Sequence, residues 1–130
     1  MRAEAQAHVD KIKDALALLR RSLDWDRALR RLDELNARVE DPTLWNDAKA
    51  AQDVMRERRR LDESIGATRA IASELADTVE LIEMAEAEGD DEMANDGTAA
   101  LAALAERAER DKVKALLSGE ADANDTYVEI

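Results

Sequence analysis

The chain has 130 residues, a net charge of −12 at pH 7, no cysteine and no phenylalanine. The length suits one domain, and the lack of cysteine excludes disulfides, thiol nucleophiles and thiolate metal sites. Alanine makes up much of the apolar content; it is the best helix former but buries little surface. We therefore expect an all-α fold, an elongated antiparallel helical bundle or coiled coil of about four helices with a long central helix.

The first two predicted helices follow two apolar stripes with spacings of three and four residues. The first stripe predicts a helix over residues 3–22 and consists of Val9, Ile12, Leu16, Leu19 and Leu23. The second consists of Trp25, Ala28, Leu32, Leu35 and Val39. The sequence leaves open one continuous kinked helix, but a break is preferred, with Ser22 or Asp24 capping the second helix.

The segment 41–47, Asp-Pro-Thr-Leu-Trp-Asn-Asp, predicts a turn held by apolar contacts. Pro42 disfavours helix for the residue before it and lacks an amide donor. Thr43, Asn46 and Asp47 are capping residue types. Leu44 and Trp45 are too apolar for a solvated loop, so we expect both to fold back as a plug over the end of the bundle.

A long third helix is predicted from residue 47 to about residue 88, because apolar residues recur there every seven positions. The repeat consists of Val54, Leu61, Thr68, Leu75 and Ile82, with Ile65, Ala72 and Val79 four positions after a member of it. Gly66 lies inside this helix at a cost of up to about 1 kcal/mol, which is too little to break it. Gly89 is expected to end it.

The fourth helix is predicted over residues 91–117, with a weak start around Asn95-Asp96-Gly97 and an end at Gly119. Its expected buried residues are Leu101, Leu104, Ala105, Ala108, Val113, Leu116 and Leu117. Residues 126–130 are expected to be extended. We therefore predict a helical domain over residues 1–118, and a linker with the first strand of a further domain over residues 119–130, as at the amino-terminal end of a longer protein.

The residues offer no recognisable active site. His8 is the only histidine and is expected at the surface, and without cysteine or a second histidine a zinc site has no ligand set. The acidic run over residues 83–92 lacks the ligand spacing of a calcium loop and is interpreted as solvated charge. No cofactor and no catalytic residue are predicted.

Charge is distributed unevenly along the chain. Residues 1–70 hold 15 Lys/Arg and 14 Asp/Glu, whereas residues 71–130 hold 4 and 17, so only the first half is suited to a phosphate backbone. The arginines are not interleaved with stacking aromatics, which argues against a generic nucleic-acid or DNA binder. No stretch approaches the length of a membrane span and no secretory signal is recognised, so the default expectation is a cytoplasmic protein.

Four segments resemble the amino-terminal helical domain of the bacterial peptide chain release factor 2 family. They are Leu23-Asp24-Trp25-Asp26, Arg31-Leu32-Asp33-Glu34-Leu35-Asn36, the turn over residues 41–47, and residues 116–130 with Gly119-Glu120-Ala121-Asp122. The turn is the most specific and favours factor 2 over factor 1. In this family a Ser-Pro-Phe tripeptide reads the stop codon and a Gly-Gly-Gln loop triggers hydrolysis of peptidyl-tRNA. Neither motif occurs here, so the resemblance implies a fragment that is not an enzyme by itself.

The resemblance implies a docking role on the ribosome, at the base of the large-subunit stalk with its rRNA and ribosomal protein, within the full-length factor. The residues expected to face the ribosome are Arg56, Arg58, Arg59 and Arg60 of the third helix, or Arg27, Arg30 and Arg31 of the second. The plainer interpretation of the third-helix arginines is a solvated helix face. A self-associating coiled-coil or adaptor module is the alternative, because Thr68 and Ala72 would leave a weakly packed seam for a second copy. An enzyme with an unrecognised site is a third interpretation.

Overall fold

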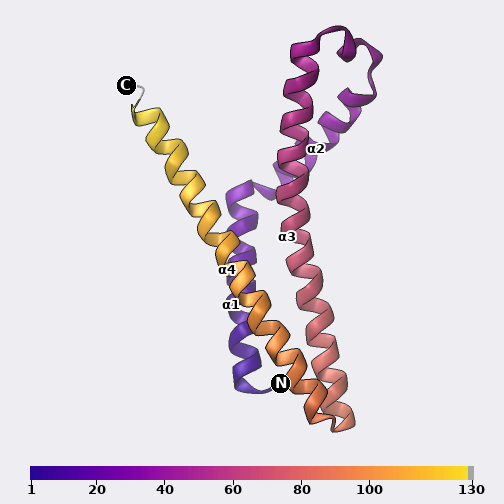
Figure 1. The fold of residues 1–130 in the computed structure, drawn as a ribbon, viewed down its shortest axis with the longest axis vertical. Helices are drawn as coiled ribbons and strands as arrows, with labels where there is room; N and C mark the ends of the chain where they lie inside the picture. Colours follow the sequence, from indigo (N-terminus) through magenta and orange to yellow (C-terminus); the bar gives the residue numbers. More distant parts are fainter. Residues whose placement is uncertain (129–130) are drawn as a thin grey trace. The chain divides into compact units, whose positions relative to one another are not determined.

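The structure, a computed structural model, describes the backbone of residues 1–128 and the side chains of residues 1–117. The elements are the α-helices α1 (Ala3–Leu23), α2 (Trp25–Glu40), α3 (Ala48–Glu88) and α4 (Asp91–Val128), with the short 3-10 helix η1 (Pro42–Asn46) between α2 and α3 (Figure 1). The all-α prediction with a long central helix is therefore confirmed for the described residues.

The chain forms two compact units. Unit 1 contains Met1–Ser22 and Ala70–Ile130, and unit 2 contains Leu23–Arg69. The long helix α3 contributes its first half to unit 2 and its second half to unit 1. Each unit has its own hydrophobic core.

The predicted break between the first two helices is confirmed at Asp24. This residue has φ 54° and ψ 69°, in the left-handed region, which ends α1 before α2 begins at Trp25. Aspartate tolerates this conformation better than most residues do. The expected cap is wrong in detail, because the Asp24 side chain makes no capping hydrogen bond; instead its backbone oxygen accepts from the Ala28 amide at 2.8 Å.

In unit 1, α1, the second half of α3 and α4 pack around one core. Its fully buried large side chains include Ile12, Ile71, Ile82 and Leu101. Arg2 donates to Asn95 at 3.1 Å and Lys112 to Asp14 at 3.4 Å, so α1 and α4 run in the same direction. The helix α3 runs antiparallel to both, since it joins α4 through a tight turn at Gly89, where φ is +72°.

The predicted start of α4 at residue 91 is confirmed. The helix begins at Asp91, and the carboxylate of Asp90 accepts from the Met93 amide at 3.0 Å, as a capping residue does. Gly97 is not a weak start but a buried contact. A Cβ at this position would lie 2.5 Å from Cγ1 of Ile82, so the absence of a side chain lets α4 approach α3 closely.

The predicted core of α4 is confirmed in its first half and wrong in its second. Leu101, Leu104, Ala105 and Ala108 are buried. Val113, Leu116 and Leu117, by contrast, are 44, 47 and 58% exposed. The reason is helical geometry: Ala115, seven residues after Ala108, is the one that packs on the core, and the three larger residues lie off that side of the helix.

The end of α4 also differs. The helix extends to Val128, past its expected end at Gly119, so residues 126–128 are helical rather than extended. A helix satisfies its backbone hydrogen bonds within itself, whereas a single strand needs a partner. Residues 129–130 of the expected strand lie outside the described residues. The domain boundary at residues 118/119 stays a prediction.

In unit 2, α2 and the first half of α3 form a hairpin closed by η1. Leu35, Leu44, Ala51 and Val54 form its buried core. The predicted turn is confirmed, with two capping carboxylates at its ends. Asp41 accepts from the amide and the hydroxyl of Thr43, at 3.0 and 2.8 Å, and Asp47 accepts from the Ala50 amide at 3.1 Å. These bonds fix the direction in which the chain enters α3.

The seven-residue pattern of α3 is confirmed in part as its buried side. Val54, Ile65, Thr68, Leu75 and Ile82 are buried, whereas Leu61, Ala72 and Val79 are partly buried. Ile71, outside the pattern, is fully buried, and Gly66 lies within the helix without interrupting it. Thr68 is 3% exposed, and its hydroxyl donates to the Ser64 carbonyl at 2.9 Å. The seam expected to be open to a second copy is therefore closed at Thr68.

Candidate functional site

The seven arginines predicted to face a partner all belong to unit 2. They differ in the cavity that they line and in the contacts that they make within the fold. Arg27, Arg30 and Arg31 of α2 line one open cavity of about 530 Å³ together with Glu34 and Glu57. Arg56 and Arg59 of α3 line a separate cavity of about 320 Å³. Arg58 and Arg60 line neither. The two predicted groups, on α2 and on α3, therefore line different cavities.

Arg31 is engaged within the fold. Its Nε and Nη2 donate to the two carboxylate oxygens of Glu57 at 2.7 and 2.9 Å, a bidentate pair that joins α2 to α3. A further bond of 3.2 Å goes to Glu34. The hydrogen bonds that Arg31 donates to Glu57 raise the pKa of Arg31, and the guanidinium of Arg31 lowers the pKa of Glu57 below its ordinary 4.5. Arg31 therefore stabilises the hairpin.

Arg58 also has a partner inside unit 2, since its Nε donates to the Asn36 side chain at 2.6 Å. Trp25, at the other end of the hairpin, has the guanidinium of Arg69 5.7 Å from its ring centroid, a cation–π arrangement. These contacts connect α2 to α3 along the length of the hairpin. The cations that remain exposed on the unit 2 half of α3 include Arg56, Arg59 and Arg60.

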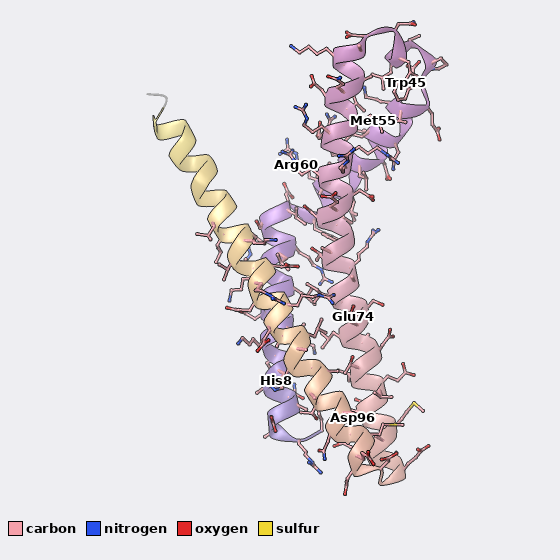
Figure 2. The ribbon with its side chains drawn as sticks, viewed as in Figure 1. His8, Trp45, Met55, Arg60, Glu74 and Asp96 are labelled. Atoms are coloured by element: carbon pink, nitrogen blue, oxygen red, sulfur yellow. The ribbon has the colours of Figure 1, made fainter. Side chains whose placement is uncertain are left out.

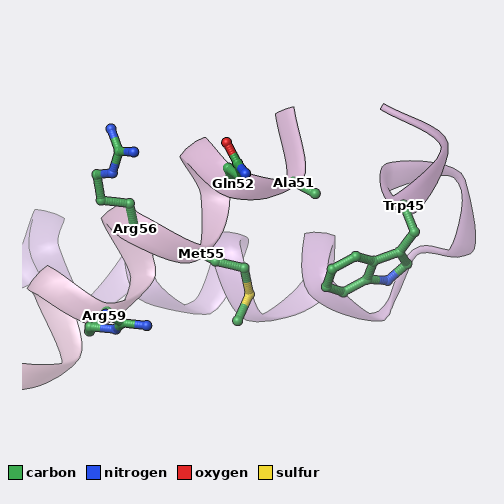
Figure 3. A pocket seen from close by; sticks show the side chains of 6 residues that line it. All are labelled: Trp45, Ala51, Gln52, Met55, Arg56 and Arg59. Atoms are coloured by element: carbon green, nitrogen blue, oxygen red, sulfur yellow. The ribbon is translucent and has the colours of Figure 1, made fainter. Parts of the chain in front are cut away.

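Arg56 and Arg59 line the same cavity as an exposed tryptophan. Figure 3 shows them with Trp45, Ala51, Gln52 and Met55 around the smaller cavity, which we call the Trp45 notch. Trp45 is 54% exposed, and its indole N–H donates to the Val39 carbonyl at 3.3 Å. Figure 2 shows Trp45 and Met55 near the turn of the hairpin, with Arg60 further along α3. The notch combines a flat aromatic surface with two cations.

The expected plug is therefore correct for Leu44, which is buried, and wrong for Trp45. A 3-10 helix has three residues per turn, so adjacent side chains point about 120° apart and only one of this pair can enter the core. The capping residues around Pro42 indicated the turn but not which apolar side chain would enter the core. For that reason the sequence pattern did not reveal that an aromatic residue lines the same cavity as two of the arginines.

Unit 1 is mainly acidic, and its cross-helix contacts are structural. His8, expected at the surface, is half-buried within α1. Cross-helix pairs such as Arg107–Glu74, at 3.0 Å, connect its helices. Among the residues that the structure describes, no three His, Asp or Glu side chains are arranged to hold a metal ion. No helix in that part of the chain has the length and apolar character needed to cross a membrane.

Comparison with known proteins gives consistent relatives. The chain is 55% identical over all its 130 residues to peptide chain release factor 2 of Paramagnetospirillum magneticum, and 48% identical over the same length to that of Roseobacter denitrificans. It is 56% identical over 107 residues, 82% of the chain, to that of Caulobacter vibrioides. The chain spans about a third of the length of these relatives, 35% for the first two and 29% for the third. Residues 28–130, which begin inside α2 and continue to the end of the sequence, match the PCRF domain, so the chain belongs to the PCRF domain family.

Proposed function

We propose that this chain is the docking domain of a peptide chain release factor that acts in translation termination. The proposal is supported by the PCRF match and by relatives that carry the name peptide chain release factor 2. The Gly-Gly-Gln and Ser-Pro-Phe motifs do not occur in the 130 residues. In this proposal codon reading and release are performed by other parts of the factor, in the cytoplasm, and this chain is not an enzyme by itself.

The observation that carries the proposal is the exposed cationic surface of unit 2. Arg56, Arg59 and Arg60 are exposed on α3, and within the described residues none of them forms an ion pair within 4.0 Å. The charge of Arg60 acts on Glu57 at longer range. Unit 2 contains 10 Lys/Arg and 11 Asp/Glu, whereas unit 1 contains 9 and 20. A phosphate-rich ribosomal surface would therefore repel unit 1 and admit unit 2.

The partner in this proposal is the base of the large-subunit stalk, with its rRNA and ribosomal protein. Arg56, Arg59 and Arg60 are the first candidates for contact. Arg27 and Arg30, exposed on α2, are the second. Arg31 and Arg58 are assigned mainly to the stability of the hairpin, because each has a partner within unit 2.

The test is a charge reversal in the release factor that carries this chain. We expect Arg56→Glu with Arg59→Glu to weaken ribosome binding at least tenfold at low salt, while release at saturating factor is largely kept. The matched control is Arg110→Glu with Lys114→Glu, which changes the net charge equally on exposed residues of unit 1. Equal affinities for the two double variants would reject the proposal.

Self-association remains a second candidate, on a different surface from the expected seam. Thr68 is buried, but Val113, Leu116 and Leu117 expose an apolar strip on α4 that a second copy could cover. Light scattering of the chain separates the two candidates. A docking domain is expected to stay monomeric at tens of micromolar, whereas an oligomerisation module would show a dimer that Leu116→Glu dissociates.

A further inference from the structure

We infer that the Trp45 notch binds one unpaired base of an RNA loop, with Trp45 as the stacking surface and Arg56 and Arg59 as contacts to the flanking phosphates. This inference rests on the proposed function, because it names the chemistry that the exposed cationic surface of unit 2 recognises. It assigns separate roles to side chains that the structure brings together from η1 and α3.

Trp45 is held in place before any ligand arrives. Its indole N–H donates to the Val39 carbonyl, and the preceding residue, Leu44, is anchored in the core of unit 2. More than half of its surface nevertheless remains accessible. An aromatic ring that is fixed and exposed offers stacking area at little cost in conformational entropy. Stacking is tolerant of base identity, because every base has a flat face.

The two arginines supply the charge that a nucleotide needs. They are three residues apart on α3, so they lie on the same side of the helix. No Asp or Glu is among the residues that line the notch. By contrast, the cavity on the other arginine group contains both Glu34 and Glu57, and Glu57 already holds Arg31. Of the two cavities, only the Trp45 notch has an unneutralised positive lining.

Gln52 and Met55 complete the notch. In Figure 3 the Met55 side chain extends between Trp45 and Arg59, where its thioether can pack on the second face or the edge of a base. The amide of Gln52 has both donors and an acceptor for a base edge. The cavity, about 320 Å³, is at the small end of the range for ligand pockets, which suits one base rather than a larger group.

The surroundings favour RNA over a protein segment. Hot spots of protein interfaces lie in well-packed, fully desolvated pockets. Here the neighbours of the ring include the exposed side chains of Gln52, Arg56 and Arg59, and the two cations match the charge of a phosphate backbone. Within a duplex the bases are stacked and their faces are covered, whereas a loop exposes bases that can stack on an aromatic residue. The site therefore distinguishes loop from duplex.

The inference is tested with the 130-residue chain and fluorescein-labelled RNA hairpins by fluorescence anisotropy. One hairpin carries an unpaired adenosine-rich loop, and the probe for comparison is a blunt duplex of the same length and charge. We expect the loop to bind at least tenfold more tightly than the duplex. Trp45→Leu should lower the affinity for the loop about tenfold and leave the duplex unchanged, whereas Trp45→Phe should retain most of the binding.

The cations are tested by a matched pair. Arg59→Gln should weaken loop binding. It should also reduce the slope of log affinity against log salt by about 1, the change expected when one phosphate contact is lost. Arg60 is an exposed neighbour outside the notch, so Arg60→Gln should have a smaller effect. Circular dichroism checks that each variant is folded. Equal binding of loop and duplex, or full binding by folded Trp45→Leu, overturns the inference.

The RNA-binding and ribosome-binding measurements together distinguish a failure of this inference from a failure of the proposed function. If Trp45→Leu weakens ribosome binding by the release factor but the loop RNA does not bind, the notch contacts a protein, and the inference fails while the docking role stands. If the reversal of Arg56 and Arg59 leaves ribosome binding unchanged while the loop RNA still binds the notch, the docking role fails instead.

Discussion

At the scale of single residues, the bidentate contact between Arg31 and Glu57 is the clearest polar contact that stabilises unit 2. It joins α2 to α3 with two bonds shorter than 3.0 Å. Because Arg31 lowers the pKa of Glu57, the carboxylate contributes stability that is fully present above its ordinary pKa of 4.5. This contribution is lost as the pH falls through the lowered pKa of the folded state.

We therefore expect Glu57→Gln to destabilise the chain at pH 7 and to do so less at pH 3, because the contribution of the ionised carboxylate declines as the pH falls below 4.5. Urea unfolding at the two pH values measures the difference in the free energy of unfolding between parent and variant. Glu63→Gln, an exposed change on the same helix, is the control and should have little effect at either pH. A Glu57→Gln effect of the same size at both pH values contradicts the linkage.

At the scale of elements, the packing of α3 on α4 depends on a residue without a side chain. Gly97 faces Ile82, whose Cγ1 and Cδ1 would be 2.5 and 3.2 Å from an added Cβ. Gly66, inside α3, has nothing within 4 Å of the same position. The two glycines thus have opposite roles: one permits a close approach, and the other only lowers the helix propensity of α3.

We expect Gly97→Ala to destabilise the chain by roughly 1–3 kcal/mol through overpacking, and Gly66→Ala to stabilise it by up to about 1 kcal/mol. Chemical denaturation measures both changes in the free energy of unfolding. In an Ile82→Ala background the Gly97→Ala cost should largely disappear, because the clashing atoms are gone. A cost that is equal in both backgrounds would show that the close approach is not its cause.

At the scale of the whole molecule, one long helix serves two separate cores. The core of unit 2 contains Leu35 and Val54, and the core of unit 1 contains Leu75 and Leu101. Leu35 and Leu101 are both 0% exposed. Since the clusters share no residue, the loss of packing in one core is expected to act first on the amides of its own unit.

Leu35→Ala and Leu101→Ala form a reciprocal pair, each expected to cost about 2–5 kcal/mol. Native-state hydrogen exchange should show lost protection in α2 and the first half of α3 for Leu35→Ala, and in α1, α4 and the second half of α3 for Leu101→Ala. Uniform loss of protection across both units by either variant would mean that α3 couples the two cores into one cooperative unit.

The sequence determined the elements because their signals are local. The spacing of apolar residues located the helices, Pro42 and Gly89 marked two interruptions, and the residues of the turn over 41–47 indicated the family. The exposed arginines could likewise be proposed from charge alone.

Where either of two neighbouring side chains could face the core, the tertiary structure decided which one does. It buried Leu44 and exposed Trp45, packed Ala115 rather than Leu116 on the core, and made Gly97 a helix contact instead of a fraying start. It also paired Arg31 with Glu57, so that only some of the predicted cations remained exposed. The physical reason is that periodicity fixes which residues share a side of one helix, whereas burial depends on which other helix approaches that side and how closely.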